Sequence, residues 1–488
     1  MSTSNQQHQV RLEVRPARDA DTATEIFVID GQFNLASRGR GRLETQLDPG
    51  IYTVKCRAGE QLWEQHVILR DRDEQVVIPP FNFVSSAPLV DTAQTHEYHM
   101  AAAEAQSRVI HVAAGQGSWI FVFVRDWTAS RGKGTRAERV ANPARGLSLR
   151  DARGKVVADL ATSSTSNPDR DPWAACNVQV NPGLYRLSLQ RPAGSRLEQM
   201  VVASPGWQTQ IFLMQRADGP EPDDKCADLV DGSIFLSRGP GFMANSVEFR
   251  RAELARLGLT GQRRVLSEDI YELLRGKLEN PMLGLYGAHL LLLEKQPDLD
   301  LLRTAVAHLR ALLSTPHPDV EALALLVKPA GSHYVFREPP MLRQSWSLLV
   351  EATATRPDLV PPDSLAANVS DDVWGEGPWL IWLERSEEAS SDLEEMLESH
   401  LRPRQRSEGA PRPARRADSP FAALRRRLSA HIQMDAFESP QPSVPPASVP
   451  ETRLDAEKIE KLVRILGLPR ATVEQLLDKI ERRRKNTP

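Results

Sequence analysis

Two stretches of this sequence, LDPGIYTVKC from Leu47 and VNPGLYRLSL from Val180, have nearly the same pattern. In each stretch a Pro-Gly pair precedes a run in which apolar and polar residues alternate. Proline restricts φ and glycine tolerates positive φ, so the pair predicts a turn. A period of two with one polar face predicts a half-buried antiparallel strand. We expect the inward faces of these strands to carry Tyr52, Val54 and Cys56 in the first copy and Tyr185, Leu187 and Leu189 in the second.

The similarity between the two copies continues beyond these strands. Downstream, Glu64 and Gln65 begin one further apolar run, and Glu198 and Gln199 begin its counterpart. Short strands separated by turns are typical of a β-sandwich, so the sequence predicts two antiparallel sandwiches, over residues 1–85 and 86–220. The other expected strands are 10–14, 25–29 and 75–78 in the first copy, and 108–112, 119–124, 146–149, 155–160 and 210–213 in the second.

This arrangement resembles the small prealbumin-like sandwich modules of the carboxypeptidase-regulatory or PEGA-like kind. Their recurring phrase is a Pro-Gly turn followed by a strand with an aromatic residue, and the resemblance covers residues 8–80 and 107–214. It implies modules that bind or space other parts and carry no chemistry of their own. The second copy has an insertion, ATSSTSNPDRDPWAAC, whose Trp173 either packs locally or belongs to a binding loop.

From about residue 245 the period of the apolar residues changes to that of helices, and we predict an α-helical domain over residues 221–386. The segment PMLGLYGAHLLLLE is apolar nearly all round, so we expect it to be a buried central helix. Near the end of this domain Trp374, Trp379 and Trp382 stand close together. They either close the core or form an exposed aromatic surface for a partner. The expected helices are 246–259, 267–278, 281–294, 298–313, 318–327 and 339–353.

Residues 387–450 are rich in charge blocks, proline and serine, a composition typical of a disordered linker. Within the linker, FAALRRRLSAHI places Phe421, Leu424 and Leu428 on one stripe if it is helical. Such a stripe either docks on a partner or a membrane surface, or belongs to a helix without a binding role.

The last segment, residues 451–488, is predicted to be a small helical module. Its phrase EKLVRILGLPRATVEQLLDKIERRRK resembles the helix-turn-helix of bacterial DNA-binding proteins, with Gly467 in the turn. Acidic Glu474 on the same face favours the alternative, a helical hairpin for docking or oligomerisation. The resemblance implies that Arg470, Thr472, Glu474 and Gln475 face the major groove and that Arg482, Arg483 and Arg484 meet phosphates.

The composition excludes some classes of protein. A net charge of −3 over 488 residues gives no global field toward nucleic acid or membrane. The N-terminus lacks the basic and apolar regions of a signal peptide, and the longest apolar stretch is shorter than the ~20 residues that span a bilayer. Three widely spaced cysteines fit a reducing compartment. We therefore expect a cytoplasmic protein without a transmembrane segment.

The sequence offers no recognisable catalytic motif. The phrase HEYH at residues 96–99 is one residue too short for a zinc-binding H-E-x-x-H, and we expect a linker helix there. We predict no catalytic residue, no metal and no cofactor. The expected function is a non-catalytic scaffold or adaptor in a bacterial signalling or defence assembly, which tethers a protein partner through its C-terminal module. The alternatives are a DNA-binding regulator that uses that module and an enzyme with an unrecognised site between sandwich and helical domains.

Overall fold

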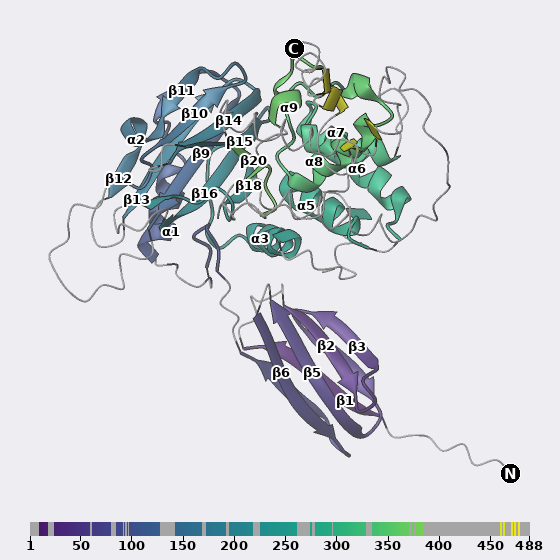
Figure 1. Ribbon diagram of the computed structural model, residues 1–488. Coiled ribbons are helices and arrows are strands. Elements are labelled where there is room, and N and C mark those ends of the chain that lie inside the picture. The colour runs from purple at the N-terminus through teal and green to yellow at the C-terminus, as the bar shows by residue number, and fades with distance from the viewer. Residues whose placement is uncertain are drawn as a thin grey trace, which may run out of the picture. The chain divides into compact units, whose positions relative to one another are not determined.

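The computed structural model is strand-rich over its first 240 residues and mostly helical beyond them (Figure 1), as the sequence predicts. By its internal contacts the chain divides into two compact units, Met1–Arg145, Ala158–Gly183 and Ala203–Thr315 in one, and Gly146–Val157, Leu184–Val202 and Pro316–Pro488 in the other. The predicted linker 387–450 lies outside the described residues. The structure describes residues 9–17, 24–58, 61–79, 84–90, 92, 95, 97–126, 142–167, 172–191, 195–217, 225–260, 274–275, 279–294, 296–327, 334–369, 373–374, 377–383, 459–460, 462–463, 470–471, 473–474 and 477–478.

The first module is a sandwich of two sheets, with strand orders β4-β1-β7 and β3-β2-β5-β6. Tyr52, Val54 and Cys56 of β5 are buried, as predicted, in one apolar core that receives side chains from both sheets. The Tyr52 hydroxyl donates a hydrogen bond of 2.9 Å to the carbonyl of Asp48 and so ties the strand to the Pro-Gly turn. The strands are β1 (Val10–Pro16), β2 (Glu25–Asp30), β3 (Leu35–Arg40), β4 (Leu43–Leu47), β5 (Gly50–Ala58), β6 (Gln61–Leu69) and β7 (Glu74–Ile78).

The second module repeats the first strand by strand. Its sheets contain the strand orders β13-β9-β16 and β11-β10-β14-β15. If β9, β10, β11, β13, β14, β15 and β16 are taken as the counterparts of β1 to β7, these orders are the same as β4-β1-β7 and β3-β2-β5-β6 in the first module. The prediction of a duplicated unit is therefore confirmed in strand order. The strands are β9 (Ser118–Arg125), β10 (Leu147–Asp151), β11 (Val156–Asp159), β13 (Trp173–Val180), β14 (Gly183–Gln190), β15 (Arg196–Ala203) and β16 (Trp207–Ala217).

The structure corrects the prediction of purely antiparallel sheets. β7 runs parallel to β1, and β16 runs parallel to β9, because in both modules the last strand joins the sheet of the first strand. The expected alternation on β14 is also wrong in part. Leu187 and Leu189 are buried, but so is Ser188 between them, while Tyr185 is only half-buried.

Two further expectations about the second module were wrong. Residues 108–112 do not form a strand; they follow the linker helix α1 (Glu97–Gln106), and only β8 (Val112–Ala113) pairs there. The insertion is not simply a loop, because it contains α2 (Leu160–Ser163) and β12 (Thr165–Asn167). Asp159 starts α2 by accepting hydrogen bonds from the backbone N–H groups of Ala161 and Thr162.

Four additional strands extend the sheets of the second module. β17 (Lys225–Ala227) and β18 (Ser233–Arg238) pair with β16. β20 (Ile381–Leu383) pairs with β15, and β19 (Val373–Trp374) pairs with β20. These strands fall within residues 221–386, where the sequence predicts helices alone.

Three helices, α5 to α7, begin within one residue of the predicted starts at 281, 298 and 318. Asn280 and Asp298 cap α5 and α6 with side-chain oxygens that accept backbone N–H groups of the first turn, and Pro318 opens α7. All eleven residues of α5 are buried, as expected for the central helix. Of the predicted helix 267–278, only Leu274 and Arg275 are described, both helical. The helices are α3 (Val247–Thr260), α5 (Pro281–Leu291), α6 (Leu299–Leu313), α7 (Pro318–Val327), α8 (Arg343–Thr353), the 3-10 helix η2 (Pro357–Leu359) and α9 (Leu365–Asn368).

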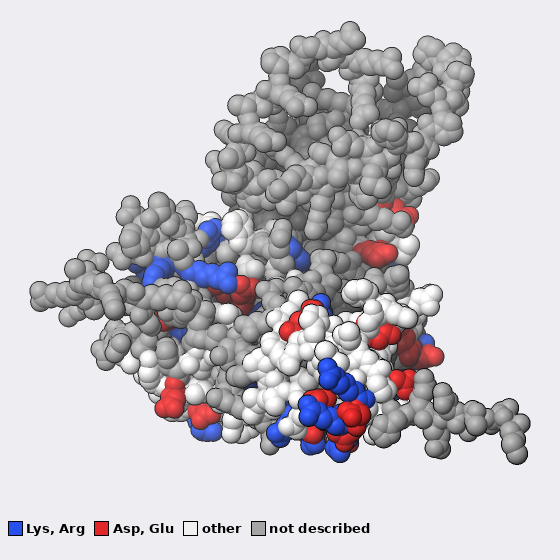
Figure 2. All heavy atoms as spheres, turned by 90° about the horizontal axis from the view of Figure 1, so that it is seen from below, with Lys and Arg blue, Asp and Glu red and all other residues white. Residues whose placement is uncertain are grey.

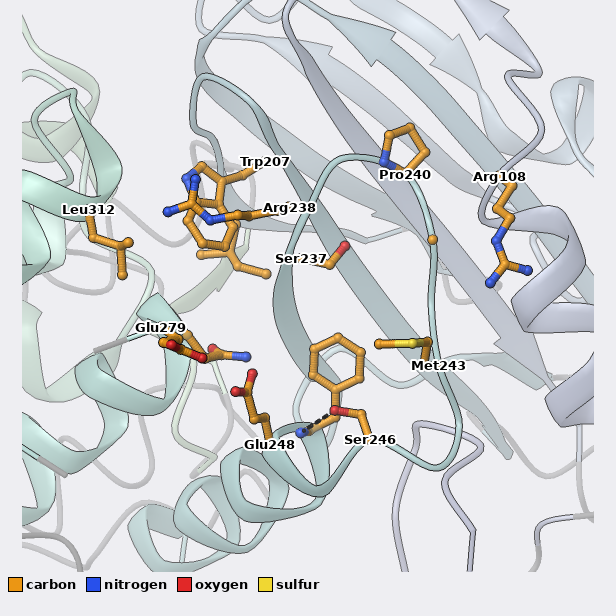
Figure 3. Close-up of a pocket in the computed structure, with 14 residues that line it drawn as sticks. Arg108, Trp207, Ser237, Arg238, Pro240, Met243, Ser246, Glu248, Glu279 and Leu312 are labelled. Atoms are coloured by element: carbon orange, nitrogen blue, oxygen red, sulfur yellow. Dashed lines mark hydrogen bonds between the residues drawn. The ribbon is translucent and has the colours of Figure 1, made fainter. Parts of the chain in front are cut away.

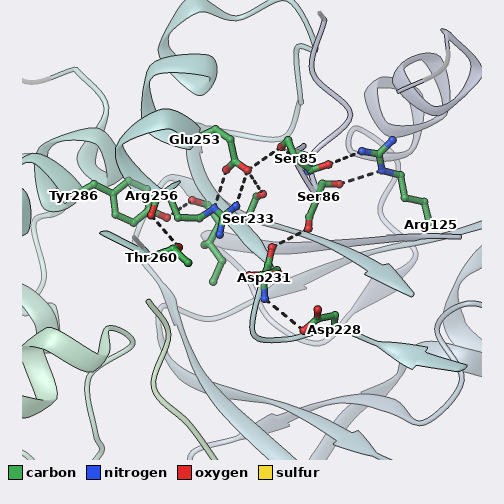
Figure 4. A network of polar contacts seen from close by, with 12 residues as sticks. Ser85, Ser86, Arg125, Asp228, Asp231, Ser233, Glu253, Arg256, Thr260 and Tyr286 are labelled. Carbon is green, nitrogen blue, oxygen red and sulfur yellow. Dashed lines mark hydrogen bonds and ion pairs between the residues drawn. The ribbon is translucent and has the colours of Figure 1, made fainter. Parts of the chain in front are cut away.

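A buried polar network holds the segment between the two modules (Figure 4). Arg125 of β9 donates hydrogen bonds to the carbonyl of Ser85, at 2.7 Å, and to that of Ser86, at 3.2 Å. The Glu253 carboxylate of α3 accepts from the Ser85 hydroxyl at 2.9 Å and pairs with Arg256 at 2.8 Å. Complete burial lowers the pKa of Arg125 to about 10, and Glu253 acts against this shift. The network therefore fixes residues 85 and 86 against both β9 and α3.

Candidate protein-interaction site

The strand β6 forms one end of the four-stranded sheet, and no other strand of the described part of the chain pairs with its outer edge. The last pair of its antiparallel ladder with β5, next to the connection between the two strands, is Ala58 with Gln61. The pair that flanks a two-residue connection is a hydrogen-bonded pair, and such pairs alternate along the ladder. The odd-numbered residues of β6 therefore exchange hydrogen bonds with β5. The even-numbered residues, Leu62, Glu64, His66 and Ile68, then turn their backbone N–H and C=O groups toward the edge. A row of such groups is a template for another strand.

The outer face of β5 and β6 is apolar at several exposed positions. Ile51 and Ile68 are cross-strand partners, 61% and 53% exposed, and Leu62 is 59% exposed. Between them lie an ion pair of Lys55 with Glu64, at 3.5 Å, and a hydrogen bond of 3.0 Å between the Thr53 hydroxyl and His66 Nδ1. Exposed apolar side chains beside an unpaired strand edge are features of an interaction surface.

The opposite sheet of the first module has a polar outer face. Arg11 pairs with Glu44 at 2.9 Å, and Arg42 pairs with Glu13 at 2.7 Å. In the densest charged group that Figure 2 shows, basic and acidic side chains likewise lie next to one another. Surfaces of balanced, paired charges give no single-sign field for nucleic acid. The exposed apolar group of Ile51, Leu62 and Ile68 therefore lies on the four-stranded sheet.

The remaining edges of the first module are blunted. β4 and β7 are only five residues long, and β7 is followed by Pro79. β3 departs from regular pairing with β2 at a register shift between Val28 and Ile29. Short strands, prolines and bulges discourage a second strand from pairing. With nine residues, β6 is the longest edge strand among the described residues of this module.

In the second module the edge that corresponds to β6 is occupied. β15 receives β20 in an antiparallel ladder, in which Glu198 faces Trp382 and Gln199 faces Ile381. Glu198 and Gln199 are the residues that match Glu64 and Gln65 in the sequence repeat. The duplicated unit thus accepts a strand at this edge in one copy, and in the other the edge has no partner among the described residues.

The structure places the predicted tryptophans mostly in the interior. Trp379 and Trp382 are 1% and 3% exposed, so neither offers its side chain to a partner, and their burial favours core closure. Trp374 is half-buried beneath the guanidinium of Arg191, which lies 4.8 Å from its ring centroid. Trp173 is not part of a loop; it begins β13 and stacks on Phe123 with centroids 5.9 Å apart. Local packing accounts for Trp173.

The described residues of the C-terminal module pack against the end of α8. Arg470 donates from its side chain to the carbonyl of Ala354, at 2.8 Å, and its backbone N–H donates to the Thr353 hydroxyl, at 3.2 Å. Arg470 also pairs with Glu474 at 2.8 Å, so it does not stand ready for a DNA base. Val463, Ala471, Val473 and Leu477 are buried. The predicted residues Phe421, Leu424, Leu428, Thr472, Gln475, Arg482, Arg483 and Arg484 lie outside the described residues.

A cavity of about 610 Å³ lies beside β16, β18, α3 and α5 (Figure 3). Its two serine hydroxyls are engaged, since Ser237 donates to the Gly239 carbonyl and Ser246 accepts the N–H of Phe249 at the start of α3. Arg238 lies over the Trp207 ring, 4.8 Å from its centroid. Neither histidine nor cysteine is among the described residues that line this cavity. The described lining therefore offers serines and glutamates but no pair of a serine or cysteine with a histidine.

The described part of the chain contains neither a metal-binding cluster nor a helix that could cross a membrane. No group of three or more His, Cys, Asp or Glu side chains is arranged to hold a metal ion there. No helix in the described ranges has the length and hydropathy needed to cross a membrane. The three cysteines are buried and form no disulfide, and burial raises the pKa of Cys56 and of Cys176 to about 12, which suppresses their thiolate forms.

Comparison with known proteins gave no family. No protein-family model matches the chain, and no curated protein matches it. Among solved structures, the chain is similar to the fimbrial anchor protein Mfa2 from Porphyromonas gingivalis, with 10% sequence identity and a TM-score of 0.15 over 49% of this chain and 99% of that chain. A superposition with this score does not define a common fold.

Proposed function

We propose that this chain is a non-catalytic scaffold whose first module binds protein by accepting a strand at the β6 edge. The observation that carries the proposal is the difference between the two copies. The same edge, marked by the same Glu-Gln pair, holds β20 in the second module and is unpaired among the described residues in the first. In such strand addition the backbone hydrogen bonds provide affinity, and alternate side chains provide specificity.

The rest of the molecule supports a scaffold more than an enzyme. Its buried charges, Glu253 with Arg256 and Arg125 with the carbonyls of Ser85 and Ser86, bind one another or the backbone and hold elements together. The C-terminal helices add a second contact surface that rests on α8 through Arg470. The setting that we propose is a cytoplasmic assembly, for instance in signalling or defence, whose catalytic subunit is another protein. Three buried cysteines that form no disulfide agree with a reducing compartment.

A proline in the edge tests this proposal. His66 directs its backbone N–H outward, so His66→Pro removes an edge donor and leaves the ladder with β5 complete. The full-length chain is purified from its native cells as wild type, as His66→Pro and as the control Phe33→Ser, which changes an exposed apolar residue away from β6. We expect the proteins that co-purify with the wild type and the control to be lost with His66→Pro. Unchanged co-purification with all three chains, each with a native circular dichroism spectrum, would overturn the proposal.

A further inference from the structure

We infer that the occupant of the β6 edge is a second copy of this chain, paired β6 to β6 and antiparallel about a two-fold axis at Gln65. The inference rests on the proposed function, because it names the partner for the same edge. A pair of identical strands related by a two-fold axis is an isologous interface, the commonest kind in homodimers. It would join the two four-stranded sheets into one continuous sheet.

The backbone restricts the possible registers. Only the even-numbered residues of β6 present outward hydrogen-bonding groups, so an even-numbered residue of one copy must face an even-numbered residue of the other. Centring the axis on Gln65 satisfies this condition. Leu62 then faces Ile68 of the second copy, and Glu64 faces His66 of the second copy.

The side chains favour this register over its neighbours. With the axis at Gln65, two exposed apolar residues face each other twice, and a carboxylate faces an imidazole twice. With the axis at Glu64, the Glu64 carboxylates of the two copies would lie opposite each other. With the axis at His66, Glu64 would lie opposite Ile68 of the second copy. Like charges directly opposite are destabilising, whereas apolar pairs and hydrogen-bonding polar pairs are stabilising. The strand is therefore more complementary to itself in this register than in either neighbouring one.

The surroundings of β6 extend this complementarity. Ile51 lies beside Ile68 on the same outer face, so each contact of Leu62 with Ile68 of the second copy would continue into an apolar group on β5. On the other face, Val67 and Leu69 are already buried in the module core, and the partly buried Trp63 packs against it. The pairing would thus cover the exposed apolar positions of β6 without moving core residues.

Charge exchange tests the register. Sedimentation velocity of the full chain should show a dimer, and Glu64→Lys, which replaces the carboxylate opposite the His66 imidazole with an ammonium group, should weaken dimerisation at least tenfold. Adding His66→Glu to Glu64→Lys places a lysine opposite a glutamate in this register but not with the axis at residue 64 or 66, so the double variant should recover the wild-type dimer. A double variant as weak as Glu64→Lys would exclude this register.

Cross-linking tests the axis. Gln65→Cys places two thiols opposite each other in a non-hydrogen-bonded pair, with Cα atoms about 4.5 Å apart, so mild oxidation should give a covalent dimer. The control Leu62→Cys places its thiols six residues out of register, beyond the ~7 Å reach of a disulfide. The three native cysteines are buried and contribute no background. Equal cross-linking of both variants would exclude an axis at Gln65.

The outcomes separate this inference from the proposed function. A chain that stays monomeric, but loses co-purifying proteins with His66→Pro, keeps the strand-accepting scaffold and excludes the second copy as its occupant. A dimer that is insensitive to every change in β6 overturns the inference. A dimer that responds to the charge exchange and cross-links at residue 65 supports both.

Discussion

The buried pair of Glu253 and Arg256 gives the sharpest stability prediction, Glu253→Ala. The Glu253 carboxylate accepts two hydrogen bonds from Arg256, at 2.8 and 3.0 Å, and one each from the hydroxyls of Ser85 and Ser233, at 2.9 and 2.8 Å. Although burial acts to lower it, the carboxylate raises the pKa of Arg256 above its ordinary value, so the guanidinium is charged. The variant would leave that charge without its carboxylate at a side chain that is 2% exposed.

The magnitude follows from the contacts that are lost. Removal of one member of a buried ion pair costs about 3–5 kcal/mol. We therefore expect Glu253→Ala to lower the free energy of unfolding by about 4 kcal/mol, a large part of the 5–15 kcal/mol typical of a domain. Glu253→Gln keeps an acceptor oxygen and should lose about half as much. The double variant Glu253→Ala with Arg256→Met removes both charges and should regain most of the loss.

Urea denaturation followed by near-ultraviolet circular dichroism measures these differences. Hydrogen exchange of residues 84–90 provides a local readout, because Ser85 and Ser86 are held by this network and by Arg125. Exchange in that segment should accelerate in Glu253→Ala. The role assigned to the Glu253–Arg256 pair would be refuted if the free energy of unfolding of Glu253→Ala lay within 1 kcal/mol of the wild-type value. Unchanged hydrogen exchange at residues 84–90 would refute it as well.

Three further predictions concern the second unit. Burial lowers the pKa of His317, so below about pH 6.5 the unfolded chain binds a proton that the native chain does not. The free energy of unfolding should therefore decrease as the pH is lowered below that value, by up to ~1.4 kcal/mol per pH unit. His317→Gln should flatten this part of the profile of unfolding free energy against pH. Arg470→Ala should release the C-terminal helices from α8 and speed hydrogen exchange over residues 459–478, whereas Arg303→Ala, which removes an exposed ion pair within α6, should leave exchange there unchanged. Trp379→Ala should lower the free energy of unfolding, measured by denaturation, by about 3–5 kcal/mol, because the Trp379 side chain is buried. A decrease below 1 kcal/mol would show that Trp379 does not support the core.

Local patterns in the sequence predicted much of the fold. The bends of the chain at Pro49 and Pro182, before β5 and β14, and the helix starts near residues 281, 298 and 318 depend on residues within one turn of each other, and the structure confirms them. Such signals are read from propensity and period because neighbouring residues determine them. The parallel pairing of β1 with β7 has no local signal, since either direction satisfies the same apolar pattern.

The candidate site was the part that sequence reasoning missed. The Glu-Gln repeat at residues 64 and 198 was visible, but its meaning depends on whether another strand lies beside it. β20 is only three residues long, and its Trp382, like the neighbouring Trp379, fits a helix that closes the core equally well. The polar network around Glu253 joins residues 168 positions apart, a separation over which composition carries no information.

The sequence by itself determined that the chain contains a duplicated strand unit followed by helices, because periodicity and turn chemistry are local properties of neighbouring residues. Only the tertiary structure decided which edges of the two units are covered. Strand pairing satisfies backbone groups that are the same in every residue, so no side-chain pattern records that β15 receives β20 while the edge of β6 stays open among the described residues.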